Sequence, residues 1–180
     1  MSNTRDNSML QEAKPTNIRR ADIEMFAEKI SSKYSLTQFE GKNEDPLSEF
    51  VTKLGGNIYY QNPSDLAASE SGSIKVWEQN NFEIYLSTFT GPLRDRFTIA
   101  HELGHYFLHS KQGEIPIRAS RKGSGRLEWE ANWFAAALLM PKKEFNEVSD
   151  KFNDDIYSIA GHFQVSTQAV SVRQEQIKNG

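Results

Sequence analysis

Two histidines four residues apart constrain this chain more than any other feature: His101 and His105 stand in the pentapeptide His-Glu-Leu-Gly-His. In an α-helix, residues four apart project from one face, one turn apart, so both imidazoles can reach the same metal ion. Glu102 follows the first histidine, where a carboxylate can hold and deprotonate a water carried by the metal. Segment 93–103 contains neither glycine nor proline, and Pro92 stands where the first turn of a helix tolerates it. The pattern therefore predicts a helix that carries a metal site, and it indicates a metallohydrolase.

An amphipathic helix with two incidental histidines is the alternative interpretation. A stripe of small and apolar residues suits a core-facing helix, namely Leu93, Phe97, Ala100, Gly104, Phe107 and Leu108. The chain has only 4 histidines, however, and the glutamate stands in the register that the chemistry needs, which favours the metal site. His109 lies on the same row, two turns from His101, so we expect it to have a structural role or to support the metal ligands from behind.

A third metal ligand has to come from elsewhere, because catalytic zinc usually takes three protein ligands and the chain has no cysteine. The best candidate is Glu128, in the Ala- and Leu-rich segment 127–141, which is expected to be a helix ending near Pro141. Asn132 lies one turn after Glu128 on the same face, where its amide can orient a ligand histidine through the free ring nitrogen. Glu130 points about 160° away from Glu128, so both cannot bind one metal. Glu130 is the alternative ligand, and a solvated position on the helix surface is possible for either glutamate.

Two blocks of this sequence resemble the ImmA/IrrE metallopeptidases: residues 96–109, and residues 128–135 with the sequence Leu138-Leu139-Met140-Pro141. The similarity extends over roughly residues 45–175. The resemblance implies a compact, minimal zincin fold, with His101, His105 and a glutamate of the second block as ligands and Glu102 as the catalytic base. Members of the family commonly cleave a helix-turn-helix transcriptional repressor, often encoded nearby, and so switch on genes of mobile elements or stress responses.

The remaining sequence predicts an α+β fold. Helical spacing or capping signals occur around residues 23–34 and 46–54, and alternating apolar residues predict strands at 57–61, 73–77 and 82–86. A small, mostly antiparallel sheet should thus precede the metal helix. We expect residues 1–16 to form a disordered arm, 17–153 the zincin-like core, and 154–180 a helix-turn-helix-like subdomain packed on that core.

Charge and composition bear on the partners. A formal net charge of −3 gives no global case for nucleic-acid binding, and the C-terminal unit has few positive charges, so direct DNA binding is disfavoured. The absence of cysteine suits a reducing compartment, the first residues lack the apolar core of a secretory signal, and no apolar run reaches the length of a membrane span. We therefore expect a cytoplasmic protein that does not contact membranes.

A basic segment separates the two blocks of the predicted metal site. It contains Glu114 as its one acid and five basic residues, Lys111, Arg118, Arg121, Lys122 and Arg126. The last four are candidates for docking a protein partner at the rim of the cleft. A solvated surface loop is the simpler interpretation, because charged loops are common.

The leading hypothesis is a zinc-dependent endopeptidase of narrow specificity that acts on a helix-turn-helix repressor. Zinc is the default metal for a His/His/Glu set, although Mn²⁺ or Fe²⁺ would also fit. The alternative is a non-catalytic protein with a zincin fold that sequesters a repressor or an antitoxin-like partner. An intact Glu102 and a complete ligand set favour the enzyme.

Overall fold

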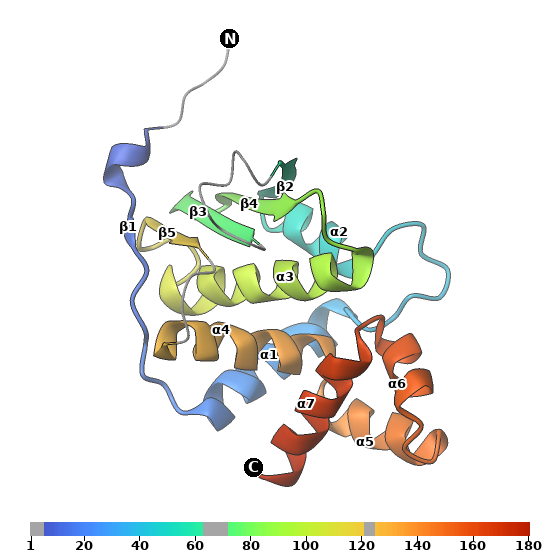
Figure 1. The fold of residues 1–180 in the computed structure, drawn as a ribbon. Coiled ribbons are helices and arrows are strands. Elements are labelled where there is room, and N and C mark those ends of the chain that lie inside the picture. Colours follow the sequence, from blue (N-terminus) through green and yellow to red (C-terminus); the bar gives the residue numbers. More distant parts are fainter. Residues whose placement is uncertain (1–5, 63–71, 121–124) are drawn as a thin grey trace.

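The computed structural model describes residues 6–62, 72–120 and 125–180 (Figure 1). Within these ranges, five strands form one sheet in the order β1-β5-β3-β4-β2. The strands are β1 (Gln11–Glu12), β2 (Gly56–Gln61), β3 (Gly72–Glu78), β4 (Asn81–Ser87) and β5 (Ile117–Ser120). The helices are α1 (Arg20–Tyr34), α2 (Pro46–Lys53), α3 (Pro92–Gly104), α4 (Arg126–Leu139), α5 (Lys142–Lys151), α6 (Ile156–Phe163) and α7 (Thr167–Lys178). Short 3₁₀ and π-helical turns add η1 (Asn7–Met9) and η2 (His105–His109).

The α+β class is confirmed, and β2, β3 and β4 coincide with the three predicted strands to within one residue at each end. The sheet is mixed rather than mostly antiparallel. The pairs β3–β4 and β3–β5 are antiparallel, whereas β2–β4 and β1–β5 are parallel. The reason is topological: β2 skips its successor β3 and pairs with β4, and β1 joins the sheet from the distant N-terminus.

Two predictions about irregular segments need correction. Residues 6–16, expected to belong to a disordered arm, contain η1 and β1, and β1 pairs with β5 at Gln11↔Ile117 and Glu12↔Arg118. The basic segment, expected to be a loop, contains β5, in which Ile117 and Ala119 are buried and alternate with Arg118 and Ser120. This alternation spans only four residues, too few to stand out in the sequence, and it becomes a strand because the edge of β3 is available.

Three layers position the metal helix. The sheet lies on one side of α3, and α4 and α1 lie on the other (Figure 1). Between the sheet and the helices, β3 and β4 contribute fully buried side chains to the core, namely Ile74, Val76, Phe82, Ile84 and Leu86. On the other side, Gly104 faces Ala131, and a Cβ on Gly104 would lie 3.0 Å from Ala131 Cα. Two small residues at the crossing thus let the backbones of α3 and α4 approach closely.

The C-terminal helices α5, α6 and α7 gather at one end of this stack (Figure 1). Asp155 and Ser166 cap the starts of α6 and α7 with their side chains, and Gln164 ends α6 in a left-handed conformation with φ 55°. Arg173 of α7 is fully buried, and it donates to Met140 O at the end of α4 and to Glu28 of α1. This guanidinium ties the helix-turn-helix-like unit to the two helices of the core.

Candidate metal centre

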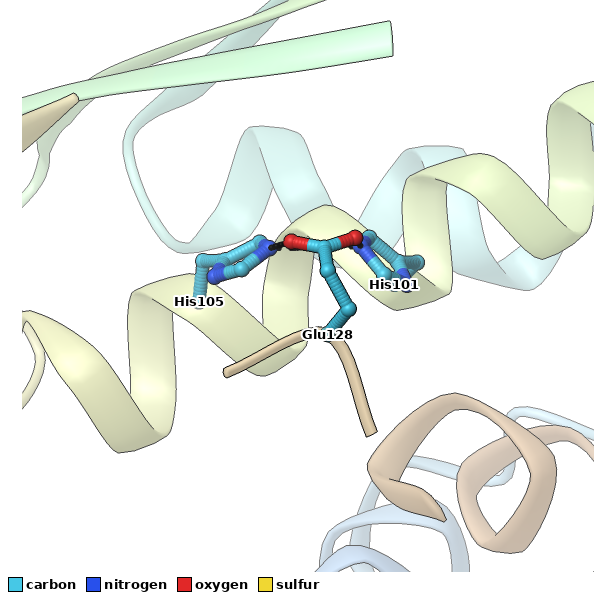
Figure 2. Close-up of side chains that lie close together, drawn as sticks. All are labelled: His101, His105 and Glu128. Atoms are coloured by element: carbon cyan, nitrogen blue, oxygen red, sulfur yellow. Dashed lines mark hydrogen bonds and ion pairs between the residues drawn. The ribbon is translucent and has the colours of Figure 1, made fainter. Parts of the chain in front are cut away.

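His101 and His105 lie on the buried face of α3 and η2, each almost without solvent exposure. Their spacing of one turn brings the two Nε2 atoms to 3.2 Å from each other. The helix is a local consequence of the sequence, since Pro92 occupies its first turn and Asp95 stands close to its N-terminus. The two imidazoles therefore converge on one point between α3 and α4 (Figure 2).

Glu128 reaches the same point from the first turn of α4 (Figure 2). Its Oε2 lies 3.2 Å from His101 Nε2, and its Oε1 lies 3.5 Å from His105 Nε2. Burial alone would raise the pKa of the Glu128 carboxyl, but the two imidazoles outweigh burial and lower the pKa to about 2. The carboxylate is therefore ionised at neutral pH. Among the described residues, the cluster with the composition and spacing of a metal site consists of His101, His105 and Glu128.

Asn132 determines which nitrogen of His101 carries the proton. Its Oδ1 lies 2.9 Å from His101 Nδ1. Because an amide oxygen can only accept, His101 donates its Nδ1–H, and in the neutral ring the Nε2 lone pair is left pointing into the centre.

Two residues, His109 and Glu130, fix the position of the proton on His105 in the same way. Its Nδ1 lies 2.9 Å from His109 Nδ1, and His109 Nε2 lies 3.0 Å from Glu130 Oε2. Burial, followed by the neighbouring His105, lowers the pKa of His109 to about 4, so this ring is neutral at neutral pH. His109 must donate its Nε2–H to the Glu130 carboxylate, and its Nδ1 accepts the Nδ1–H of His105. In a neutral His105 this arrangement leaves the Nε2 lone pair pointing into the centre as well.

The donor set fits a metal ion. Two Nε2 lone pairs and an ionised carboxylate face one another at 3.2–3.5 Å. When both imidazoles are neutral, these atoms are all acceptors and repel one another, and a cation between them would relieve that repulsion. A divalent cation held by His101, His105 and Glu128 would supply that charge, and metal binding needs these ligands to be deprotonated.

Glu102 is fully buried next to the first histidine, beneath the start of β3. A Cβ on Gly72 would lie 3.2 Å from Glu102 Oε1 and only 2.5 Å from Thr98 Cγ2. A larger residue at this position would have to displace Thr98, so glycine suits the close approach of β3 to the Glu102 carboxylate. Sequence reasoning did not single out Gly72, since a lone glycine at the start of a strand carries no distinctive signal.

Glu130 lies on the other side of α4 from the metal cluster. Both of its oxygens accept hydrogen bonds from residues of three segments: Oε2 from Thr16 and His109, and Oε1 from Asn17 and Arg126. Burial would raise the pKa of this carboxyl, but the hydrogen bonds from Arg126, Thr16 and His109 lower it to about 2. The geometry thus brings Glu128, and not the alternative Glu130, to the two Nε2 atoms.

Two of the four candidate docking residues are paired within the chain. Arg118 donates to Glu12 at 2.6 Å on the surface. Arg126 donates to Glu130 at 2.9 Å and to Ile18 O, and its guanidinium lies over the ring of Trp133 at 4.9 Å. Arg121 and Lys122 lie outside the described residues. A docking role for the four stays a prediction.

Comparison with known proteins places the sequence among related ones. The sequence model of the IrrE N-terminal-like domain matches residues 63–175. The curated protein Metallopeptidase ImmA of Bacillus subtilis (strain 168) is 34% identical over an alignment of 86 residues, which covers 46% of this chain and 50% of that protein. This chain thus matches about half the length of that relative.

Among solved structures, a Mycobacterium tuberculosis transcriptional regulator matches 83% of this chain and 45% of its own, with a TM-score of 0.57 at 18% identity. At this identity the likeness concerns the fold alone. In the described part of the chain, no helix has both the length and the apolar character needed to cross a membrane.

Proposed function

The chain belongs to the family of the IrrE N-terminal-like domain, and from this membership and the geometry of the centre we propose that it is a zinc-dependent endopeptidase of narrow specificity. The observation that carries the proposal is the convergence of His101, His105 and Glu128 on one point, with Glu102 buried beside it. Nitrogen and oxygen donors in this combination suit zinc better than Mg²⁺ or Ca²⁺, while Mn²⁺ and Fe²⁺ are competing occupants.

A bound divalent cation would supply Lewis acidity to the scissile carbonyl and to the attacking water. The residues of the chain do the rest. Glu102 accepts the proton of the attacking water and passes it to the leaving amine, which is general base and then general acid catalysis. Asn132 and His109 hold the ligand imidazoles with their Nε2 lone pairs directed inward. The buried setting of Glu102 keeps bulk water from competing for its carboxylate.

The resemblance to the ImmA/IrrE metallopeptidases supports a helix-turn-helix transcriptional repressor as the substrate. Its cleavage would derepress genes of a mobile element or a stress response.

The test compares the wild-type protein with Glu102→Gln, and with Glu114→Gln as a matched control on an exposed acid. Each protein is loaded with zinc and incubated with the helix-turn-helix repressor encoded closest to its gene, and cleavage is followed by mass spectrometry. Glu102→Gln should keep one zinc per chain and lose about 10²–10⁴-fold in rate, because the amide cannot take up the proton. Glu114→Gln should cut like the wild type.

Two other outcomes would contradict the proposal. Cleavage by Glu102→Gln at the wild-type rate would show that Glu102 is not the base. Tight binding of the repressor by the zinc-loaded wild type without any cleavage would favour sequestration instead. Elemental analysis of protein purified without added metal identifies the occupant, and a predominance of manganese or iron would contradict zinc.

A further inference from the structure

Residues 10–17 form a strap along the edge of the molecule, which we call the N-terminal strap. It begins with β1, the edge strand of the sheet, where Gln11 N donates to Pro116 O at 3.2 Å and Ala13 N donates to Arg118 O at 3.1 Å. Leu10 anchors this end, since its side chain is buried. The strap then runs from β5 past α4 to the start of α1 (Figure 1).

The far end of the strap closes on one buried carboxylate. Thr16 donates both its backbone N–H and its hydroxyl to Glu130 Oε2, each at 2.8 Å, and Asn17 N donates to Glu130 Oε1 at 2.8 Å. Asn17 adopts φ 58°, a left-handed conformation that asparagine tolerates better than most residues. With this turn, two consecutive N–H groups point at the same carboxylate. The strap is thus held by charge-assisted hydrogen bonds rather than by apolar burial alone.

The Glu130 carboxylate also begins a series of hydrogen bonds that runs through His109 to His105. Glu130 Oε2 accepts from Thr16 and from His109, and His109 accepts from His105. An ionised carboxylate can only accept, so His109 donates to Glu130 through Nε2. A His105 that binds metal through Nε2 carries its proton on Nδ1 and donates it to His109 Nδ1. A residue of the strap and a candidate metal ligand are therefore separated by two side chains.

We propose that Glu130 and His109 are positioning residues of the metal centre, and that they couple the N-terminal strap to it. The strap orients Glu130, Glu130 holds the proton of His109 on Nε2, and His109 Nδ1 holds the proton of His105 on Nδ1, which leaves His105 Nε2 for the metal. Coupling of this kind is reciprocal, so a bound metal also tightens the strap. The inference rests on the metal centre of the proposed function.

The first experiment measures zinc affinity by competition with a chromophoric chelator. His109→Phe preserves the ring volume but can neither donate nor accept, so it should weaken zinc binding by about 10- to 100-fold, the usual loss when a group behind a ligand is removed. His162→Phe is the matched control. His162 Nε2 lies 3.1 Å from Glu144 Oε1, a similar histidine–glutamate pair that is remote from the metal centre. This variant should bind zinc like the wild type. Equal affinity of a folded His109→Phe protein and the wild type would overturn the positioning role. A wild type that binds no zinc would instead overturn the metal centre itself.

The second experiment needs no variant at a buried position. Hydrogen–deuterium exchange of the wild type is compared with and without zinc at the amides of Thr16 and Asn17, with the amides of α7 as the internal reference. Zinc should slow exchange in the strap by a larger factor than in α7. Equal slowing in both segments would show only global stabilisation and would overturn the coupling.

A surface variant completes the test of the strap. Thr16→Val removes the hydroxyl that donates to Glu130, and Thr88→Val removes an exposed hydroxyl that faces Asn62. Thr16→Val should weaken zinc binding by less than His109→Phe does, and Thr88→Val should leave it unchanged. Equal zinc affinities of the two threonine variants would show that the N-terminal strap is not coupled to the metal centre.

Discussion

Replacing Gly104 by alanine should destabilise the protein, although alanine is the better helix former. Relative to glycine, alanine in a helix interior contributes about 0.5–1 kcal/mol. Here, however, the new Cβ would lie 3.0 Å from Ala131 Cα and 3.2 Å from Ala131 O, which is backbone that no rotamer change can move aside. Forcing extra volume into a packed interior costs about 1–3 kcal/mol. The expected net effect is a loss of about 1 kcal/mol in the free energy of unfolding.

Gly161 is the matched control, because it is a glycine in the last turn of α6 whose added Cβ would meet no atom within 4 Å. Gly161→Ala should therefore stabilise the protein by about 0.5–1 kcal/mol. Urea unfolding measures both, and with a slope of about 2 kcal/mol/M the midpoint of Gly104→Ala should fall by about 0.5 M. The difference between the two variants isolates the cost of overpacking.

The zinc affinity of Gly104→Ala should also fall, since α3 and α4 bear the ligands on either side of this crossing. Adding Ala131→Gly removes only the more distant contact, at 3.4 Å, so the double variant should regain little stability. If Gly104→Ala stabilises the protein as much as Gly161→Ala, or if Ala131→Gly restores full stability, the close approach of the two backbones is not as described.

Three further predictions concern other contacts. Asn132→Leu removes the acceptor of His101 Nδ1–H and should weaken zinc binding by about 10- to 100-fold in chelator competition; unchanged affinity would contradict the assigned role. Arg173→Met removes the buried guanidinium that pairs with Glu24 and Glu28 of α1, and it should lower the free energy of unfolding by about 3 kcal/mol. A loss smaller than the error of a urea titration would show that these ion pairs do not hold α7 to the core. The hydrogen bonds from Ser158 hold the pKa of the Asp155 carboxyl below its usual 3.8, so this cap stabilises the fold above pH 3.8, and the stabilisation is lost as the pH falls through the lowered pKa. Ser158→Ala should raise the pKa of Asp155 in an NMR titration. An unchanged pKa would exclude the serine side chain as a cause.

Local signals in the sequence predict most of the elements around the centre. The i, i+4 spacing of His101 and His105 places both on one face of α3 and of η2, which continues it, because residues four apart in a helix lie one turn apart. Likewise, Asp45 caps α2 and Pro46 starts it, as the sequence indicates, since both effects act within a single turn. Strands β2, β3 and β4 follow from alternation over five to seven residues.

Local signals in the sequence do not decide between Glu128 and Glu130 as the third metal ligand. Helical periodicity says that the two carboxylates point in opposite directions, but not which of them points at the histidines. The packing of α4 on α3 decides this. Gly104 of α3 meets Ala131, which stands three residues after Glu128, so the face of α4 that bears Glu128 is turned toward α3.

The sequence by itself determined the metal helix, its two histidines, the adjacent glutamate and the caps and turns around them, because each of these depends on residues within a turn or two of one another. Only the tertiary structure decided that β1 pairs with β5, that Thr16 and Asn17 close on Glu130, and that His109 links Glu130 to His105. The hydrogen bonds from the strap to Glu130 span 113 and 114 residues, and no local pattern encodes which distant carboxylate a backbone N–H will meet. That choice is made when burial of α4 leaves Glu130 in need of donors and the strap, held at the edge of the sheet, supplies them.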